Sequence, residues 1–406
     1  MVNQVEWNRK QMDLFEFFQS TDISNLNHCP GIYQFYNFLK NEAKPLVEKL
    51  TNMKFTRLTA TCSMYTRGDY LLVHDDLLSN RRIAFVYYIS PWDNAKEWSD
   101  EMGGSLEIFG TDENDLPQFP VLRKINPKDN QFVFFKVGRK SFHQVGEVTC
   151  TDHPRITING WFYGDEDHPE NPLDKLTNDD LSLSIKKPSI NSNLKIINEN
   201  YLSKDSKIEI QSQIEDNSEI KLDKFFSEDF AKEVLKELKT LDTWKVKGPA
   251  ISQYYEYLDL TNLENSSSLR KFIDIFKSEE FIKLLHEYTE LDIYGPKSKS
   301  PKLTLELQKW SSGCYSILGD IGSNEDALDL IFYFNEAENV GNVTYINNED
   351  EEIDDEESVL LTVEPSANSM NIVYRTSQQI RFVKYISKNK PLPDGPVFIM
   401  SASYKE

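Results

Sequence analysis

The feature that most constrains the fold of this chain is an internal repeat. An ordered series of short apolar segments in the first half of the 406 residues recurs in the second half. The first series comprises residues 70–76 (YLLVHDD), 82–89, the pair Gly103-Gly104, 131–137 and 142–145. The second comprises residues 315–320, 327–334, the pair Gly341-Asn342, 369–374 and 381–385. Because the period is far too long for a solenoid, the sequence predicts one β-domain duplicated into two similar barrels.

Local patterns predict the elements around this repeat. Ile32, Phe35, Tyr36 and Leu39 have helical spacing, and β-rich runs between residues 55 and 164 are separated by Gly, Pro, Asn and Asp. A polar stretch follows, then helical signals beginning near Ser227, and strand signals again from residue 303. We therefore expect a mainly β chain with flanking helices (α+β). Its expected parts are a first barrel at 1–164, a linker at 165–200 and a second barrel with a helical insert at 201–406.

Composition and charge restrict the class of protein. The formal net charge is −21, which disfavours nucleic-acid binding and suits a basic protein partner, although acidity can also serve solubility alone. The four cysteines form no CxxC pair and suit a reducing compartment. We find no run of 18 apolar residues and no signal-peptide pattern, so we expect no membrane span and a cytoplasmic or nuclear location.

The first half carries a candidate metal site that the second half lacks. His74 and Asp76 stand two residues apart on a strand-like segment, where side chains share one face. With His143 they would form the facial triad of Fe(II) oxygenases, which leaves positions open for a co-substrate and O₂. In the second half the matching positions are Gly319 and approximately Val383. A lone His-x-Asp is often accidental, but the repeat indicates that the barrel does not require these histidines.

A second group of residues could bind a carboxylate beside the metal. Arg155 begins a strand-like segment after His143, and a buried arginine can grip a carboxylate with two parallel hydrogen bonds. Thr157 lies two residues further on and faces the same way. Tyr88 and Tyr65 could add phenol groups, although packing is the simpler role for most of the 19 tyrosines.

These motifs closely resemble the eukaryotic ribosomal prolyl 3-hydroxylases over nearly the whole chain. The resemblance rests on His74-Asp-Asp, Met102-Gly-Gly-Ser-Leu, Ser141-Phe-His-Gln-Val and the segment 155–164 (RITINGWFYG). It implies tandem double-stranded β-helix (jelly-roll) domains, of which the second is catalytically silent. It also implies iron ligands at His74, Asp76 and His143, and 2-oxoglutarate contacts at Arg155, Tyr88, Thr157 and Tyr65.

The resemblance further implies an activity and its partners. The expected enzyme uses Fe(II), 2-oxoglutarate and O₂, with ascorbate as reductant, to hydroxylate a proline at C3 in a basic small-subunit ribosomal protein, which affects translation. The sequence departs from the family in two ways. The family usually has a further segment ahead of the part around Asp13, whereas this sequence begins close to that point, and the insert at 94–100 is longer and more polar than expected. An acidic run at 349–357 holds eight carboxylates, which could recruit a basic partner or simply form a solvated loop.

Two other functions remain open at the sequence level. One keeps the oxygenase chemistry and changes the target to a different protein or to a nucleobase, and the acidity disfavours the nucleobase. The other is a non-enzymatic, translation-associated binding module with a vestigial iron site. The intact set of His74, Asp76, His143 and Arg155 argues against this second alternative, because the second half has lost the two histidines.

Overall fold

A computed structural model describes residues 4–89, 98–168, 182–184, 194–263, 267–291, 293, 302–317, 325–347 and 359–405. The chain divides into two compact units. Unit 1 contains residues 1–176 with the short segments 248–252 and 387–391, and unit 2 contains residues 177–247, 253–386 and 392–406. The expected linker at 165–200 falls largely outside the described residues and stays a prediction.

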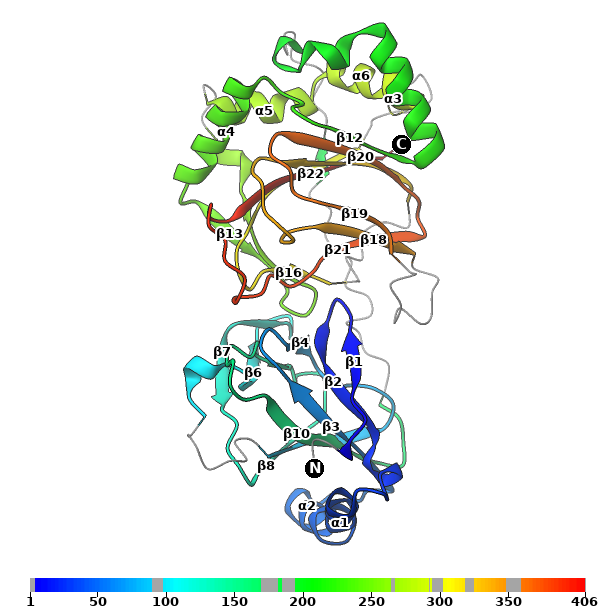
Figure 1. Ribbon diagram of the computed structural model, residues 1–406, viewed down its shortest axis with the longest axis vertical. Helices are drawn as coiled ribbons and strands as arrows, with labels where there is room; N and C mark the ends of the chain where they lie inside the picture. Colours follow the sequence, from blue (N-terminus) through cyan, green and yellow to red (C-terminus); the bar gives the residue numbers. More distant parts are fainter. Residues whose placement is uncertain are drawn as a thin grey trace. The chain divides into compact units, whose positions relative to one another are not determined.

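Unit 1 is built on one curled antiparallel sheet (Figure 1). Its strands follow the order β7-β6-β9-β4-β2-β3-β10-β5-β8, and β1 pairs with β2. The strands are β1 (Asn8–Gln11), β2 (Phe15–Asp22), β3 (Arg57–Tyr65), β4 (Tyr70–His74), β5 (Arg81–Tyr88), β6 (Leu106–Thr111), β7 (Pro117–Ile125), β8 (Gln131–Lys136), β9 (His143–Val145) and β10 (Arg155–Tyr163).

Helices cover one face of this sheet. Pro30–Phe38 (α1) and Lys44–Thr51 (α2) are joined by a π-helical segment, Leu39–Ala43, and they confirm the helical pattern predicted near residue 32. The alternation of β10 separates two environments. Ile158 and Phe162 belong to the core beneath the helices, whereas Arg155, Thr157 and Trp161 occupy the opposite positions of the pleat. That second face is the interior of the barrel, where the candidate site lies.

Unit 2 has a larger sheet and more helices. Its strand order is β19-β18-β21-β16-β14-β15-β22-β17-β20-β12, with β13 on β14 and β11 on β15. The strands are β11 (Ser182–Ser184), β12 (Glu219–Leu222), β13 (Trp244–Lys247), β14 (Gln253–Leu258), β15 (Lys302–Trp310), β16 (Tyr315–Ser316), β17 (Ala327–Tyr333), β18 (Val343–Asn347), β19 (Val359–Val363), β20 (Ser369–Arg375), β21 (Gln379–Val383) and β22 (Val397–Lys405). The helices α3 (Lys204–Asn217), α4 (Glu228–Thr240), α5 (Ser268–Phe276) and α6 (Glu279–Thr289) lie along one side of this unit (Figure 1).

The two sheets correspond strand for strand, which confirms the predicted pair of jelly-roll barrels. Each strand of the first order matches one of the second, from β7 and β19 at one edge to β8 and β20 near the other, and β1 matches β13. Ser227 precedes α4 as predicted. The sequence reasoning missed β1, β2 and α3. It also missed β12, which extends the second sheet beyond the common set.

The register aligns the two barrels residue by residue. Arg155 of β10 pairs with Tyr65 of β3, as Val397 of β22 pairs with Trp310 of β15. A glycine in the left-handed region precedes β6 and β18, with φ +67° at Gly104 and +76° at Gly341. A Cβ atom on Gly104 would lie 3.0 Å from Arg155, and one on Gly341 would lie 3.4 Å from Val397. Arg155 and Val397 therefore occupy equivalent positions.

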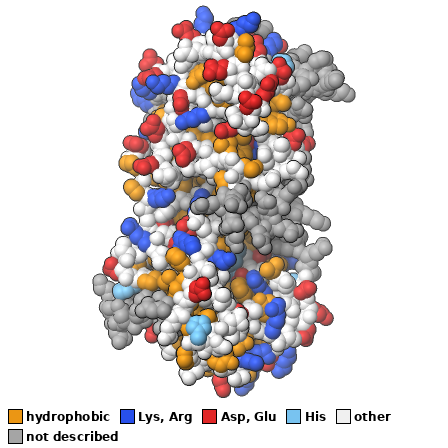
Figure 2. All heavy atoms as spheres, turned by 45° about the vertical axis from the view of Figure 1, so that its right-hand side comes forward, with side chains coloured by type: hydrophobic (Ala, Val, Ile, Leu, Met, Phe, Trp, Pro, Cys, Tyr) orange, Lys and Arg blue, Asp and Glu red, His pale blue; other side chains and the backbone are white. Residues whose placement is uncertain are grey.

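The surface and the helices add two observations. Acidic and basic side chains are interspersed over the described part of the face drawn in Figure 2, so the net charge of −21 does not gather there in one patch. Among the described residues, no helix is both long and apolar enough to cross a membrane.

Candidate metal centre and co-substrate pocket

The structure brings the three predicted metal ligands together. The candidate ligand atoms of His74, Asp76 and His143 all lie within 4.8 Å of one another. The Nε2 atoms of His74 and His143 lie 3.7 Å and 3.4 Å from the carboxylate oxygens of Asp76. The two histidines are Cα partners across β4 and β9, so strand pairing itself brings two of the three candidate ligands together. Two imidazoles and one carboxylate form the donor set that suits non-haem Fe(II).

Asp76 reaches this cluster by a different route from the one the sequence predicted. Strand β4 ends at His74, so simple alternation along a strand does not carry Asp76 to the same face. Asp76 instead adopts φ +61°, which is the left-handed region that a non-glycine residue enters at a cost. The local turn therefore directs its carboxylate toward the two histidines.

Hydrogen bonds and burial favour the tautomer and the neutral form in which a histidine can bind a metal. The Nδ1 groups of His74 and His143 each donate to a backbone carbonyl two residues earlier, at 2.8 Å. These bonds fix the tautomer that leaves Nε2 as the ligand atom. Burial and the neighbouring His143 lower the pKa of His74 to about 4, so its ring is neutral at pH 7. Burial alone would raise the pKa of Asp76, but the hydrogen bond and charge of His143 outweigh burial and hold this pKa well below its ordinary value.

Arg155 is a buried cation near the candidate metal ligands. Its side chain is buried, with 1% of the residue exposed, and none of the described carboxylates forms an ion pair with it. Its guanidinium carbon lies 4.9 Å and 5.3 Å from the ring centroids of Tyr65 and Tyr88. The charges of Arg155 and Asp76 both act on the Tyr65 hydroxyl, so Arg155 lies in the neighbourhood of the triad.

Several buried polar atoms in this region have no hydrogen-bond partner among the described residues. They are Arg155 Nε, the Tyr88 hydroxyl, Ser63 Oγ and Trp161 Nε1. Such atoms cost free energy unless a ligand satisfies them. A carboxylate-bearing co-substrate beside a metal fits this set of donors.

Of the other predicted pocket residues, Tyr65, Tyr88 and Thr157 all lie next to Arg155 in the sheet. Tyr65 is the cross-strand partner of Arg155, and Tyr88 is that of Thr157. Thr157 itself donates to Asn159 at 3.3 Å. The structure also adds Ser63, the partner of Thr157 on β3, which the sequence reasoning missed because an isolated serine in a strand carries no signal.

Arg81 and Trp161 were missed in the same way and lie close to the candidate metal ligand Asp76. The Arg81 guanidinium lies 3.7 Å above the Trp161 ring, and its Nη1 atom lies 3.5 Å from Asp76 Oδ1. The nearby indole N–H of Trp161 also lowers the pKa of Asp76. These contacts hold the carboxylate whose backbone is strained.

Among the described residues of the second barrel, other side chains stand at the positions of this constellation. Val397 and Ile399 occupy the positions of Arg155 and Thr157, and Trp310 that of Tyr65. Because Leu106 pairs with Val145 as Val343 pairs with Val383, the residue equivalent to His143 is Arg381, and the approximate match to Val383 was wrong by two residues. Gly319, the expected counterpart of His74, lies outside the described residues.

Comparisons with known proteins match two separate parts of the chain. Residues 60–163 match the 2OG-Fe(II) oxygenase superfamily, and residues 189–406 match the family described as oxoglutarate and iron-dependent oxygenase degradation C-term. The chain is 45% identical to prolyl 3-hydroxylase sudestada1 of Drosophila melanogaster, covering 100% of this chain and 79% of that protein. It is 31% identical to prolyl 3-hydroxylase OGFOD1 of Xenopus laevis, covering 95% and 79%.

The fold and the matched superfamily define a 2-oxoglutarate- and Fe(II)-dependent dioxygenase, as predicted. This class uses Fe(II) as its cofactor and 2-oxoglutarate and O₂ as co-substrates. The two imidazoles and the carboxylate in the first barrel suit Fe(II), and the buried arginine suits 2-oxoglutarate. Within that class, the chain belongs to the prolyl 3-hydroxylase family. A prolyl hydroxylase acts on a protein substrate, which agrees with the expected class of partner.

Proposed function

We propose that this protein hydroxylates C3 of a prolyl residue in a basic small-subunit ribosomal protein. His74, Asp76 and His143 would hold Fe(II), and Arg155, Tyr88, Thr157 and Tyr65 would surround 2-oxoglutarate. The observation that carries the proposal is the pairing of two features in one barrel. A His-Asp-His cluster with ligand atoms within 4.8 Å adjoins a buried arginine that lacks a carboxylate partner among the described residues.

The protein's residues have distinct tasks in this reaction. Arg155 would bind the distal carboxylate of 2-oxoglutarate through its guanidinium. The neutral His74 ring is ready to bind metal without first losing a proton. Arg81 and Trp161 keep Asp76 in its strained position. When bound, the iron and 2-oxoglutarate supply the oxidation that inserts one oxygen atom of O₂ into the prolyl C–H bond, with release of succinate and CO₂.

The proposed substrate is a ribosomal protein in the cytoplasm or nucleus, and the proposed reductant is ascorbate. Two curated relatives carry the name prolyl 3-hydroxylase, and the net charge of −21 suits a basic substrate protein. Direct nucleic-acid binding is disfavoured by the same charge. Ascorbate would keep the iron reduced, and the enzyme would act in the cytoplasm or nucleus. The acidic run at 349–357 lies outside the described residues.

The test is a coupled assay on the full chain. The protein is loaded anaerobically with Fe(II) and supplied with 2-oxoglutarate, ascorbate, O₂ and proline-containing peptides of small-subunit ribosomal proteins. We expect succinate release together with the gain of one oxygen by a peptide, and amino-acid analysis should identify 3-hydroxyproline. His143→Ala should remain folded and lose both products, whereas His28→Gln, at an exposed histidine, should retain them.

The outcomes separate the alternatives. Succinate release without any change in peptide mass would retain the oxygenase and refute the ribosomal target. Absence of both products from a folded, iron-loaded protein would favour the binding module. The second barrel illustrates how far a non-catalytic copy departs, since valine and isoleucine replace Arg155 and Thr157 there.

A further inference from the structure

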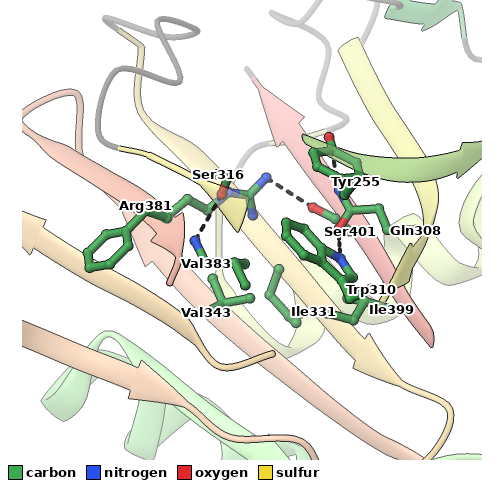
Figure 3. A pocket seen from close by; sticks show the side chains of 11 residues that line it. Tyr255, Gln308, Trp310, Ser316, Ile331, Val343, Arg381, Val383, Ile399 and Ser401 are labelled. Carbon is green, nitrogen blue, oxygen red and sulfur yellow. Dashed lines mark hydrogen bonds between the residues drawn. The ribbon is translucent and has the colours of Figure 1, made fainter. Parts of the chain in front are cut away.

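The second barrel encloses a hollow that the proposed reaction does not use. It lies between strands β14, β15, β16, β17, β18, β21 and β22, and its space of about 390 Å³ includes the open mouth. Figure 3 shows the Arg381 guanidinium reaching across it toward Ser401.

The hollow occupies the same place in its barrel as the candidate iron site in the first. By register, Arg381 stands where His143 stands, and Trp310 where Tyr65 stands. Trp310 stacks on Tyr255 with centroids 4.5 Å apart, just as Tyr65 stacks on Phe17 at 4.7 Å. The scaffold is therefore retained, while the chemistry of its interior has changed from metal ligation to a guanidinium.

One end of the hollow gathers hydrogen-bond donors. Among the described residues that line it, Arg381 carries the only charge. Ser401 accepts from Arg381 at 3.0 Å, and Ser316 accepts from the backbone N–H of Val383 at 2.9 Å. A hydroxyl that accepts in this way can still donate its own hydrogen to a ligand. Arg381, Ser316 and Ser401 thus present a guanidinium and two hydroxyls to the same space (Figure 3).

A buried carboxylate behind the lining holds the guanidinium in place. Asp329 is fully buried and lies 3.2 Å from Arg381 Nη1 and 3.0 Å from Arg375 Nε. Neither Asp329 nor the nearby Glu306 lines the hollow itself. The arrangement fixes the guanidinium before any ligand arrives, which reduces the entropy cost of binding.

The remaining wall is aliphatic. Val343, Val383, Ile331 and Ile399 lie beside one another below the polar end (Figure 3). They are buried, each with 5% or less of its surface exposed. A ligand that fits must therefore combine a compact anionic head with a short branched apolar body.

We propose that this hollow binds a small aliphatic carboxylate. Its carboxylate accepts hydrogen bonds from Arg381, Ser316 and Ser401, and its alkyl end packs on the four aliphatic side chains. The second barrel would thus be a ligand-binding domain rather than only a support for the first. This site is independent of the proposed hydroxylation, so either can fail without the other.

The probe is isovalerate, with the uncharged isovaleramide as its isostere. Binding is measured by calorimetry and ligand-observed NMR on the full chain under anaerobic conditions. Mn(II) and saturating 2-oxoglutarate occupy the first barrel, so that its arginine does not compete. We expect isovalerate to bind at one site and isovaleramide to bind at least about tenfold more weakly, which is about 1.4 kcal/mol.

Variants test the assigned residues. Arg381→Gln should weaken isovalerate binding at least about tenfold, whereas Lys239→Gln, which removes an exposed charge of unit 2, should not. Because Arg381 also pairs with buried Asp329, Ser401→Ala is a second variant that keeps this ion pair and should weaken binding severalfold. The proposal is overturned by undetectable binding of millimolar isovalerate, by equal binding of the amide, or by wild-type binding in both variants.

Discussion

Replacing Arg155 with methionine should weaken the binding of 2-oxoglutarate but leave the stability of the ligand-free protein almost unchanged. Two hydrogen bonds from a guanidinium to a carboxylate contribute about 1.5–3 kcal/mol each. Even the lower sum of about 3 kcal/mol corresponds to a dissociation constant for 2-oxoglutarate raised about a hundredfold. The ligand-free protein should lose little or no stability, because the buried guanidinium has no carboxylate partner among the described residues and its desolvation is costly. Contacts with the Tyr65 and Tyr88 rings offset part of that cost, by about 2 kcal/mol.

Two measurements check this prediction. Calorimetry with Mn(II)-loaded protein gives the 2-oxoglutarate dissociation constant, and urea unfolding with and without 2-oxoglutarate gives the stabilisation by the ligand. Wild-type protein should gain about 2.7 kcal/mol at a concentration of 100 dissociation constants, and Arg155→Met should gain almost nothing at that same concentration. Arg155→Lys, which keeps the charge without the planar fork, should be intermediate. An unchanged dissociation constant, or unfolding of the ligand-free methionine variant, would refute the assigned role.

Three further predictions concern the surroundings of the site. Arg81→Met should weaken Mn(II) binding about tenfold, because it frees Asp76, whereas Arg57→Met, which removes an equivalent stack on Tyr163 away from the cluster, should not; equal affinities would contradict this. The pKa of His74 is lowered to about 4 from its unfolded value near 6.5, so the metal-free protein should lose stability as the pH falls from 6.5 to 4. Denaturant unfolding should show a smaller loss of stability in His74→Gln and the full loss in His28→Gln. A wild-type pH profile in His74→Gln would exclude this cause. Gly160→Ala should destabilise unit 1 by about 3 kcal/mol or more, because its Cβ would lie 1.9 Å from the Thr59 carbonyl oxygen, whereas Gly110→Ala meets open space; similar unfolding midpoints for the two variants would show that the backbone adapts.

The repeat made much of the fold predictable, because a duplicated order of strands carries its own topology. The same repeat indicated which residues the barrel could lose, and this drew attention to His74 and His143. The positions of Thr157 and Arg155 followed from period-two alternation on β10.

What the sequence could not provide depends on contacts between distant segments. Arg81 and Trp161 meet at Asp76 only because β5 and β10 are neighbours in the sheet. The left-handed backbone conformation at Asp76 could not be predicted, because the residue there is not a glycine. The match of His143 to Arg381 rather than Val383 required the pairing of β6 with β9 and of β18 with β21, since no sequence motif spans those strands.

The central claim is tested most directly by the fate of molecular oxygen. Full-length protein with Fe(II), 2-oxoglutarate and ascorbate is exposed to ¹⁸O₂ in the presence of a peptide that it modifies, and the peptide is fragmented by mass spectrometry. The account predicts one ¹⁸O atom on a single proline, at C3, with an equal amount of succinate, and no label with His143→Ala. Label on another residue type, or labelling by the His143→Ala variant at the wild-type rate, would contradict it.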